Sequence, residues 1–197
     1  MARVAWWNVA LEDLARDPLL APLCAQARER GLEANADLLA TYVRAVCGQQ
    51  VSTAAAEKTA RKVLAFAGED APAAVLASAS IQELAGLGLS AAKAQAISWL
   101  AQGYLLGPLT REALAPLTDT AVRARLTALK GIGPWTADMV LIFGLNRPDV
   151  WAASDYGLRS AVAAKGLTMD IGNRFAPWRT AAGWLLWNER SRAPVQY

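Results

Sequence analysis

The 197-residue sequence contains no histidine and only two cysteines, Cys24 and Cys47. Without histidine, the chain cannot build a Ser-His-Asp triad, a Cys-His pair or a histidine-ligated metal site. The spacing of the two cysteines does not resemble a metal-binding knuckle, and we expect both to be buried free thiols. Acid–base chemistry would therefore depend on carboxylates, lysine, tyrosine or water.

Long uncharged apolar runs are also absent. No stretch approaches the roughly 20 residues that a membrane helix needs, and the N-terminus lacks the basic and apolar segments of a secretory signal. We expect a soluble cytoplasmic protein, nucleoid-associated if bacterial, with no membrane partner. Apolar residues make up 54% of the chain and aromatic residues 8%, which excludes a disordered chain.

Acidic residues become scarce toward the C-terminus. Residues 1–119 hold ten Lys/Arg and twelve Asp/Glu, whereas residues 120–197 hold ten and five. The local basic excess favours a polyanionic partner weakly, although the net charge is only +3 and solvated helix faces often carry such an imbalance.

Alternating runs of β-branched residues are too short to predict a sheet. Nearly every segment instead shows helical spacing, with Gly, Ser, Thr or Pro at its ends. We expect an all-α fold of many short helices in two lobes. The predicted helices are 36–48, Ser52 to Gly68, a short one from Asp70, Ser80 to Gly86, Ser90 through Leu100, Thr118 to Leu129, 136–143, one from Ser154, and one with Pro177 in its first turn.

A glycine turn, Gly131-Ile132-Gly133, separates two of these helical patterns. Glycines leave the backbone amides of a tight turn uncovered, and Pro134 suits the first position of the following helix. With Thr136 as a cap, such a helix start favours an anion such as a phosphate. The alternative is a tight connection with no binding role.

Asp155 follows Ser154 at the start of another predicted helix, whose Leu158, Val162 and Ala163 we expect to face inward. The plain interpretation is an N-cap or first-turn acid. Amide donors and the helix dipole would also stabilise a negative charge there, and a fixed carboxylate suits stabilisation of a developing cation.

The sequence has eight tryptophans, most of which we expect to be core anchors. Trp135 differs because it lies in the helix start after the glycine turn, where it would either stack on an unpaired base or pack between lobes. Gln49 and Gln50 link two predicted helices. They form either an ordinary polar connection or a pair of amides that fill a gap in a duplex.

Taken together, these elements resemble the helix-hairpin-helix DNA glycosylase superfamily, and within it the alkylbase branch, the 3-methyladenine DNA glycosylase II type. The resemblance covers about residues 36–190. The matching elements, in chain order, are Arg44-Ala45-Val46-Cys47-Gly48-Gln49-Gln50-Val51-Ser52, Gly88-Leu89-Ser90-Ala91-Ala92-Lys93-Ala94, Leu129 to Ala137, Ser154-Asp155-Tyr156, and Pro177-Trp178-Arg179 ahead of Trp187.

The resemblance implies a role for each matching position. Asp155 corresponds to the catalytic aspartate, and Gln50 to the residue that enters the space of a flipped nucleotide. The implied base-pocket residues are Trp135, Tyr156 and Trp187. The implied phosphate contacts are Gly131, Gly133, Thr136 and Ser52. Family hairpins often hold a monovalent cation, Na⁺ or K⁺, which here would lie at the carbonyl oxygens of Leu129 and Gly131, although the chemistry requires no cofactor.

Several departures from relatives narrow the expected activity. Relatives that form a Schiff base and nick DNA carry a lysine where this chain has Trp135, so we expect no lyase step. Two cysteines cannot build the four-cysteine iron-sulfur cluster of other relatives. We expect no N-terminal β domain, and its pocket residue would be absent or replaced by Trp6 or Trp7. Gln50 also differs from the apolar wedge of some members.

The sequence therefore predicts a monofunctional DNA glycosylase that flips alkylated bases, 3-methyladenine and related lesions, out of duplex DNA and excises them in base excision repair. We expect a monomer with a lobe of residues 1–35 and 145–197 that carries Asp155, and a lobe of residues 36–144 that ends in the helix-hairpin-helix at the cleft. The alternatives are a non-catalytic helix-hairpin-helix DNA-binding module and a bifunctional glycosylase/lyase.

Overall fold

The computed structural model describes residues 3–27, 29–35 and 37–189. Every regular element in these ranges is helical, and the one extended pairing among them is an isolated antiparallel bridge between Arg3 and Glu33. The all-α prediction is confirmed. Within the same ranges, no helix combines the length and apolar character that crossing a membrane requires.

The chain divides into two compact units. Among the described residues, we call 37–140 the hairpin unit, and 3–27 and 29–35 with 141–189 the aspartate unit.

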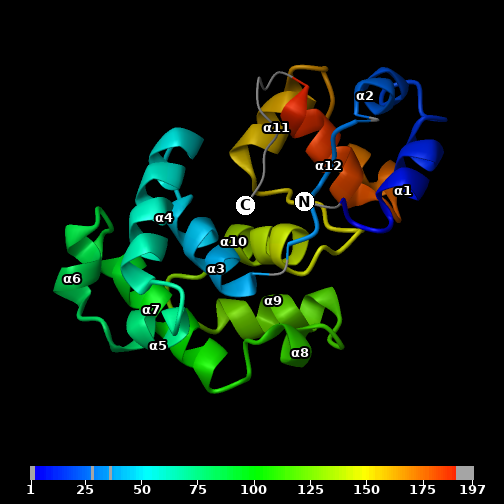
Figure 1. Cartoon of the computed structure of the whole chain (residues 1–197). Coiled ribbons are helices and arrows are strands. Elements are labelled where there is room, and N and C mark those ends of the chain that lie inside the picture. Colours follow the sequence, from blue (N-terminus) through cyan, green and yellow to red (C-terminus); the bar gives the residue numbers. More distant parts are fainter. Residues whose placement is uncertain (1–2, 28, 36, 190–197) are drawn as a thin grey trace. The chain divides into compact units, whose positions relative to one another are not determined.

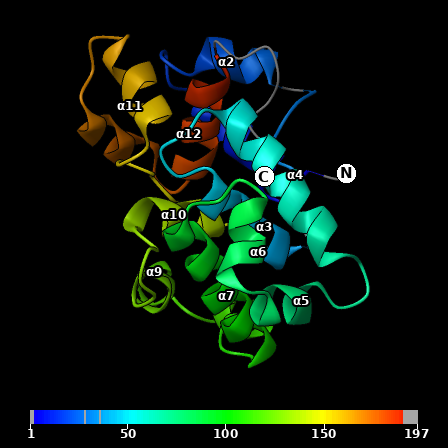
Figure 2. The same ribbon diagram turned by 90° about the vertical axis from the view of Figure 1, so that its left-hand side faces the viewer.

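The hairpin unit is built around α7, which packs against α3, α5 and α6. Figures 1 and 2 both show α9 beside α10, with the glycine turn between them. The helices of this unit are α3 (Leu38–Cys47), α4 (Thr53–Ala67), α5 (Pro72–Ser78), α6 (Ile81–Gly86), α7 (Ala91–Leu105), α8 (Arg111–Leu114), α9 (Asp119–Thr127) and α10 (Pro134–Met139).

Hydroxyl side chains start five helices of the hairpin unit, four of them at residues that the sequence predicts and the fifth, α8, at Thr110. The residues Ser52, Ser80, Ser90 and Thr118 each accept a hydrogen bond from the backbone amide three residues ahead. Each such cap contributes about 1 kcal/mol to helix stability.

In the aspartate unit α12 packs against α1, α2, α11 and the 3₁₀ segment η2. Figure 1 shows α12 in red between α11 in gold and α1 in blue. The core includes Trp7 and Trp184, whose rings meet edge to face with centroids 5.0 Å apart. The elements of this unit are α1 (Trp7–Leu14), α2 (Ala21–Gln26), α11 (Tyr156–Ala163), η2 (Met169–Phe175) and α12 (Arg179–Asn188). The π-helical segment η1 (Val140–Gly144) comes between α10 and α11 in the chain.

Two local predictions in the aspartate unit are wrong. Pro177 lies outside the last helix, which begins at Arg179, because the Trp178 backbone amide donates to the Phe175 carbonyl in a turn. Ala163 is exposed because it is the last residue of α11, where the core-facing stripe has ended. The short elements α2, α8 and η2 were not predicted, since each spans too few residues to show a helical period.

Candidate functional site

The helix-hairpin-helix lies within the hairpin unit. Gly131 has φ of +88°, a conformation that residues with a Cβ rarely adopt, so the turn requires glycine there. Ile132 is buried and its amide donates to the Leu129 carbonyl at 3.1 Å, which anchors the turn. Gly133 differs from Gly131, since its φ is −94° and an added Cβ would meet no atom within 4 Å.

The start of α10 has no side-chain cap. Its N-cap is Gly133, with Pro134 at the first helical position. The predicted cap at Thr136 is wrong, because Thr136 lies in the first turn of the helix and is only 2% exposed. Its hydroxyl oxygen instead accepts a hydrogen bond from Gln49 Nε2 at 2.9 Å. A helix start without a carboxylate or hydroxyl cap is open to an external anion.

An ion pair fixes the two hairpin helices to each other. Arg123 Nε in α9 lies 2.7 Å from Asp138 Oδ1 in α10. Asp138 is buried, and this burial raises the pKa of its carboxyl group more than the hydrogen bond from Arg123 lowers it. The pair sets the orientation of α10, and hence of the amides at its start.

Gln50 and Ser52 lie in the segment that joins α3 to α4. Gln50 is exposed and has φ of +56°, which is uncommon for a residue other than glycine or asparagine. Ser52 is also exposed, and its Oγ accepts a hydrogen bond from the Ala55 amide at 3.3 Å. Trp135, in the first turn of α10, is partly buried.

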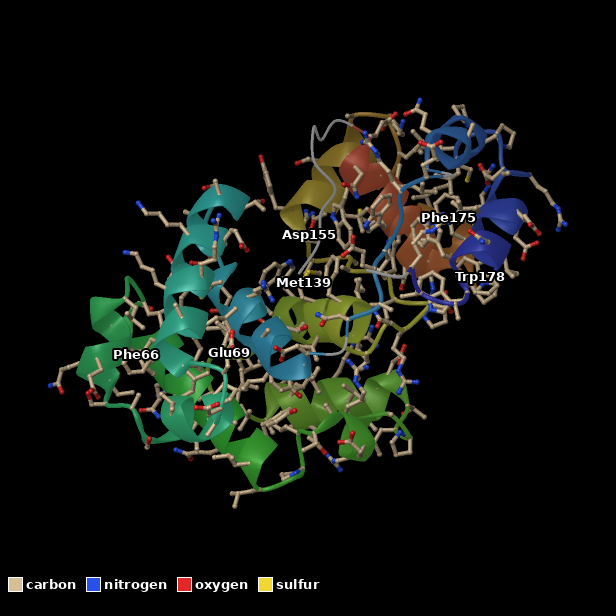
Figure 3. All side chains as sticks on the ribbon, in the orientation of Figure 1. Phe66, Glu69, Met139, Asp155, Phe175 and Trp178 are labelled. Atoms are coloured by element: carbon tan, nitrogen blue, oxygen red, sulfur yellow. The ribbon has the colours of Figure 1, made fainter. Side chains whose placement is uncertain are left out.

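Asp155 is the N-cap of α11 in the aspartate unit, as Figure 3 shows. Its Oδ1 accepts hydrogen bonds from the Leu158 amide at 2.6 Å and from the Trp187 indole N–H at 2.8 Å. A Cβ added at Gly157 would lie 3.2 Å from Asp155 Oδ1 and 3.5 Å from the Trp187 ring. The absence of a side chain at Gly157 thus lets the indole reach the carboxylate.

The aromatic residues predicted for the base pocket differ in their surroundings. Tyr156 is 85% exposed and directly follows the aspartate. Trp187 is partly buried, stacks on Phe143 with centroids 6.1 Å apart, and uses its N–H on Asp155. Trp7 is buried in the core of its unit, and the Trp6 indole N–H donates to the Asn146 carbonyl.

A second ion pair lies beside the loop that leads to Asp155. Arg179 donates from Nε and Nη2 to the two carboxylate oxygens of Asp149, at 2.7 and 2.8 Å. These hydrogen bonds lower the pKa of Asp149. The Thr180 hydroxyl donates to the Arg147 carbonyl at 2.6 Å and accepts from the Val150 amide at 3.0 Å, which fixes the same loop to α12.

Both cysteines are buried free thiols. Burial raises the pKa of Cys47 to about 11, so this thiol is protonated at neutral pH. Across residues 3–27, 29–35 and 37–189, no three His, Cys, Asp or Glu side chains are grouped so that they could hold a metal ion.

Sequence reasoning missed the supporting contacts of three side chains described above: Gln49, Arg123 and Asp149. Each contacts a residue at least 15 positions away in the chain, so no local pattern shows the contact. The nearest signal is the polar pair Gln49-Gln50, whose two amides were considered for a gap in a duplex and not for a contact with the hairpin.

A family model for the HhH-GPD superfamily base excision DNA repair proteins matches residues 43–163. This match covers more than half of the chain, and the chain belongs to that superfamily. The matched range includes Gln50, the glycine turn and Asp155, and ends before Trp187. The family resemblance inferred from the sequence is confirmed.

Individual relatives belong to the alkylbase branch. DNA-3-methyladenine glycosylase 1 of Schizosaccharomyces pombe is 31% identical in an alignment that covers 74% of this chain and 69% of that protein. DNA-3-methyladenine glycosylase 2 of Escherichia coli is 32% identical in an alignment that covers 88% of this chain and 61% of that protein. A probable bifunctional transcriptional activator/DNA repair enzyme of Mycobacterium tuberculosis is 33% identical, and the match spans only 38% of its length.

Solved structures agree with these relatives. The 3-methyladenine DNA glycosylase of S. pombe, in complex with abasic DNA, superposes with a TM-score of 0.79 and 25% identity, covering 96% of this chain and all of that one. A DNA-3-methyladenine glycosidase from Bacillus halodurans gives a TM-score of 0.71 and 28% identity, covering 91% of this chain and 87% of that one.

Proposed function

We propose that this protein is a monofunctional DNA glycosylase that hydrolyses the bond between deoxyribose and an alkylated base, 3-methyladenine and related lesions, in duplex DNA. The superfamily and the alkylbase relatives support the reaction class. The observation that carries the proposal for this chain is Asp155, a carboxylate held at the start of α11 by two hydrogen bonds to one of its oxygens.

Binding begins with the DNA backbone. The uncapped start of α10 supplies amides and the positive end of a helix dipole to a phosphate, next to Gly131 and Gly133. At Thr136 the contact would use the backbone amide, because the side chain is buried. Ser52 caps α4 by accepting the Ala55 amide, so a second phosphate contact there would use the O–H donor of its exposed hydroxyl. Such contacts position the protein on DNA without reading its sequence.

The damaged nucleotide then rotates out of the base stack, and Gln50 fills the space that it leaves. Gln50 suits this role because it is exposed in a left-handed turn, a strained conformation of the kind that clusters at functional sites. Its amide can also form hydrogen bonds with the base left without a partner.

The flipped base is recognised by aromatic faces, for which Tyr156, Trp135 and Trp187 are the candidates. A base alkylated at a ring nitrogen often carries positive charge, and contact with an aromatic face then contributes ~0.5–2 kcal/mol. Tyr156 has the most accessible ring of the three. Recognition by aromatic faces therefore selects bases that carry positive charge, and not bases of one particular shape.

In the bond-breaking step the electron pair of the glycosidic bond leaves with the base, and positive charge develops on the deoxyribose. Asp155 stabilises this oxocarbenium-like sugar electrostatically. A water molecule then bonds to the anomeric carbon and gives its proton to Asp155 or to solvent, which leaves an abasic site. A cationic base is a good leaving group, so little acid catalysis is needed and the lack of histidine is tolerated.

Strand cleavage is not part of the proposed reaction. Trp135 stands where lyase relatives carry the nucleophilic lysine, so no Schiff base is expected at this position. The chemistry also needs no cofactor.

A structural Na⁺ or K⁺ at the hairpin carbonyls remains a separate prediction. The Leu129 carbonyl already accepts the Ile132 amide and the Gly131 carbonyl accepts Gln49 Nε2. Such an ion would therefore have to use the second lone pair of each oxygen.

We further propose that the protein binds duplex DNA as a monomer, in the cytoplasm, at the nucleoid if the source is bacterial. The alkylated duplex is the partner that the chemistry requires. The basic excess in residues 120–197 supports DNA as the partner.

The test is base release from duplex DNA treated with dimethyl sulfate. We expect free 3-methyladenine, abasic sites that break only on alkali treatment, and no covalent adduct after borohydride reduction. Breaks without alkali together with a trapped adduct would indicate a lyase. DNA binding without base release would indicate the non-catalytic module.

A further inference from the structure

The turn that carries Gln50 is held by two side chains, Lys93 and Gln49, to which the proposed mechanism assigns no role. Gln50 has φ of +56°, a strained conformation that persists only where the surrounding structure imposes it. The neighbours of the turn should therefore supply fixed contacts. They do so through Lys93 on one side and Gln49 on the other.

Lys93 lies in the first helical turn of α7. It binds two carbonyl groups of the segment that leads to Gln50. Its Nζ donates to the Cys47 carbonyl at 3.0 Å and to the Gln49 carbonyl at 2.8 Å. Cys47 ends α3, so the ammonium group also interacts favourably with the negative end of that helix. Lys93 is partly buried, and this burial lowers the pKa of its ammonium group.

Gln49 connects the same turn to the helix-hairpin-helix. Its side-chain nitrogen donates to the Gly131 carbonyl at 3.0 Å and to Thr136 Oγ1 at 2.9 Å. Gly131 is the glycine with positive φ in the hairpin turn, and Thr136 is buried in the first turn of α10. One amide group therefore contacts the hairpin on both sides of Gly133.

We propose that Gln49 and Lys93 are positioning residues that hold Gln50 in its exposed, left-handed turn and at a fixed distance from the phosphate-binding hairpin. The proposal rests on the proposed function, because it assigns Gln50 to the space left by a flipped nucleotide. A phosphate bound at the hairpin then fixes where Gln50 meets the duplex. The turn is already ordered in the free protein, so ordering it costs no free energy when DNA binds. This pre-organisation favours flipping of the nucleotide.

The fixed distance between Gln50 and the hairpin matters only where a flipped nucleotide leaves a space in a duplex. A lesion in single-stranded DNA leaves no such gap, so the contribution of Gln50 and its two supports should vanish there. A general folding or catalytic defect would slow both substrates equally. The ratio of the two rates thus separates positioning from a purely structural role.

The experiment measures single-turnover release of 3-methyladenine from dimethyl sulfate-treated DNA, as duplex and after strand separation. The variants are Gln49→Met and Lys93→Met, which remove the donors at similar side-chain length, and Lys93→Arg, which keeps a cationic donor. The matched controls are Gln102→Met, which removes hydrogen bonds to Ala77 and Ser98 elsewhere in the hairpin unit, and Lys62→Met on the exposed surface of α4.

We expect Gln49→Met and Lys93→Met to release base from duplex about tenfold more slowly, the size expected when two hydrogen bonds are lost. Their rates on single strands should stay within about twofold of the wild type, since no gap is filled there. Lys93→Arg should restore the duplex rate, and both controls should match the wild type. In a Gln50→Ala background Gln49→Met should have little further effect, because it acts through Gln50.

Equal slowing of duplex and single-strand release, or full additivity with Gln50→Ala, would overturn the proposal, as would an unchanged duplex rate. If the melting curve shows that Gln49→Met does not fold, the test rests on the duplex and single-strand release rates of Lys93→Met and Lys93→Arg. Failure of the proposed function is distinct, because the wild-type protein would then release no base from either substrate.

Discussion

The starts of α10 and α11 are built differently although both follow a short turn. α10 begins at Gly133 without a side-chain cap, whereas α11 begins at Asp155, whose carboxylate accepts the Leu158 amide. An uncapped start attracts an anion, while a start that already holds a carboxylate repels one. This difference supports the proposal that the start of α10 binds a phosphate and that Asp155 at the start of α11 stabilises a positive sugar.

The largest effect should follow from removing the charge at α11. We expect Asp155→Asn to lower single-turnover base release by about 10²–10³-fold, the loss typical when one electrostatic contact to the transition state is removed. DNA affinity should hardly change. Asp37→Asn is the matched control, because Asp37 caps α3 through the Ala40 amide in the same way. Since Asn caps helices about as well as Asp, both variants keep their caps, and a similar loss in both would show that the effect does not depend on the place of Asp155 in the candidate site.

The contact from Trp187 to Asp155 sharpens this assignment. Trp187→Phe keeps an aromatic ring against Phe143 but removes the N–H donor at 2.8 Å from the carboxylate. We expect base release to slow about tenfold, with little change in substrate affinity. Trp178→Phe removes a comparable indole contact, at 2.9 Å from Asp13 in α1, and should leave the rate unchanged. Figure 3 shows Trp178 beside α1. A loss of affinity without a loss of rate in Trp187→Phe would assign this ring to base binding alone.

The two glycines of the hairpin should respond differently to substitution. Gly133→Val adds a side chain at the uncapped helix start in an ordinary backbone conformation, so we expect weaker binding to all DNA sequences and little change in stability. Gly131→Ala forces alanine to a φ of +88° and should cost about 1–2 kcal/mol of folding free energy. Binding titrations at several salt concentrations and urea melts measure the two effects. Equal loss of stability in both variants would contradict the distinction.

The smallest expected effect is on the pH dependence of stability. It comes from the ion pairs Arg123–Asp138 and Arg179–Asp149. The pKa of Asp149 is lowered, so its stabilisation is present above its ordinary pKa and is lost as the pH falls through the lowered value. The pKa of Asp138 is raised, so its contribution is present below its ordinary pKa and is lost as the pH rises. Urea melts at neutral pH and at about pH 3, which lies below the ordinary Asp pKa of about 3.9, should therefore show opposite pH trends for Asp149→Asn and Asp138→Asn, each relative to the wild type. Parallel trends would contradict the account.

Much of the helical framework could be predicted from local sequence. Ser52, Ser80, Ser90 and Thr118 mark helix starts because a cap needs only the residue itself and an amide three positions ahead. The same logic failed at Thr136, since a buried contact with Gln49 replaced the expected local cap.

The supports of the candidate site could not be read from local patterns. The contacts from Gln49 to Gly131 and from Trp187 to Asp155 join residues 82 and 32 positions apart. Such pairs depend on how helices pack, which the spacing of residues along one helix does not specify. Family resemblance supplied the candidate roles of Gln50 and Asp155, and the structure adds the side chains that hold them.

The most direct test of the central claim compares Gly133→Val with Asp155→Asn in one experiment that measures duplex affinity and single-turnover release of 3-methyladenine. The account predicts opposite profiles: Gly133→Val binds more weakly but releases base at the wild-type rate when DNA is saturating, and Asp155→Asn binds normally but releases almost none. If both variants lost affinity and rate in the same proportion, the two helix starts would not have the separate roles assigned to them.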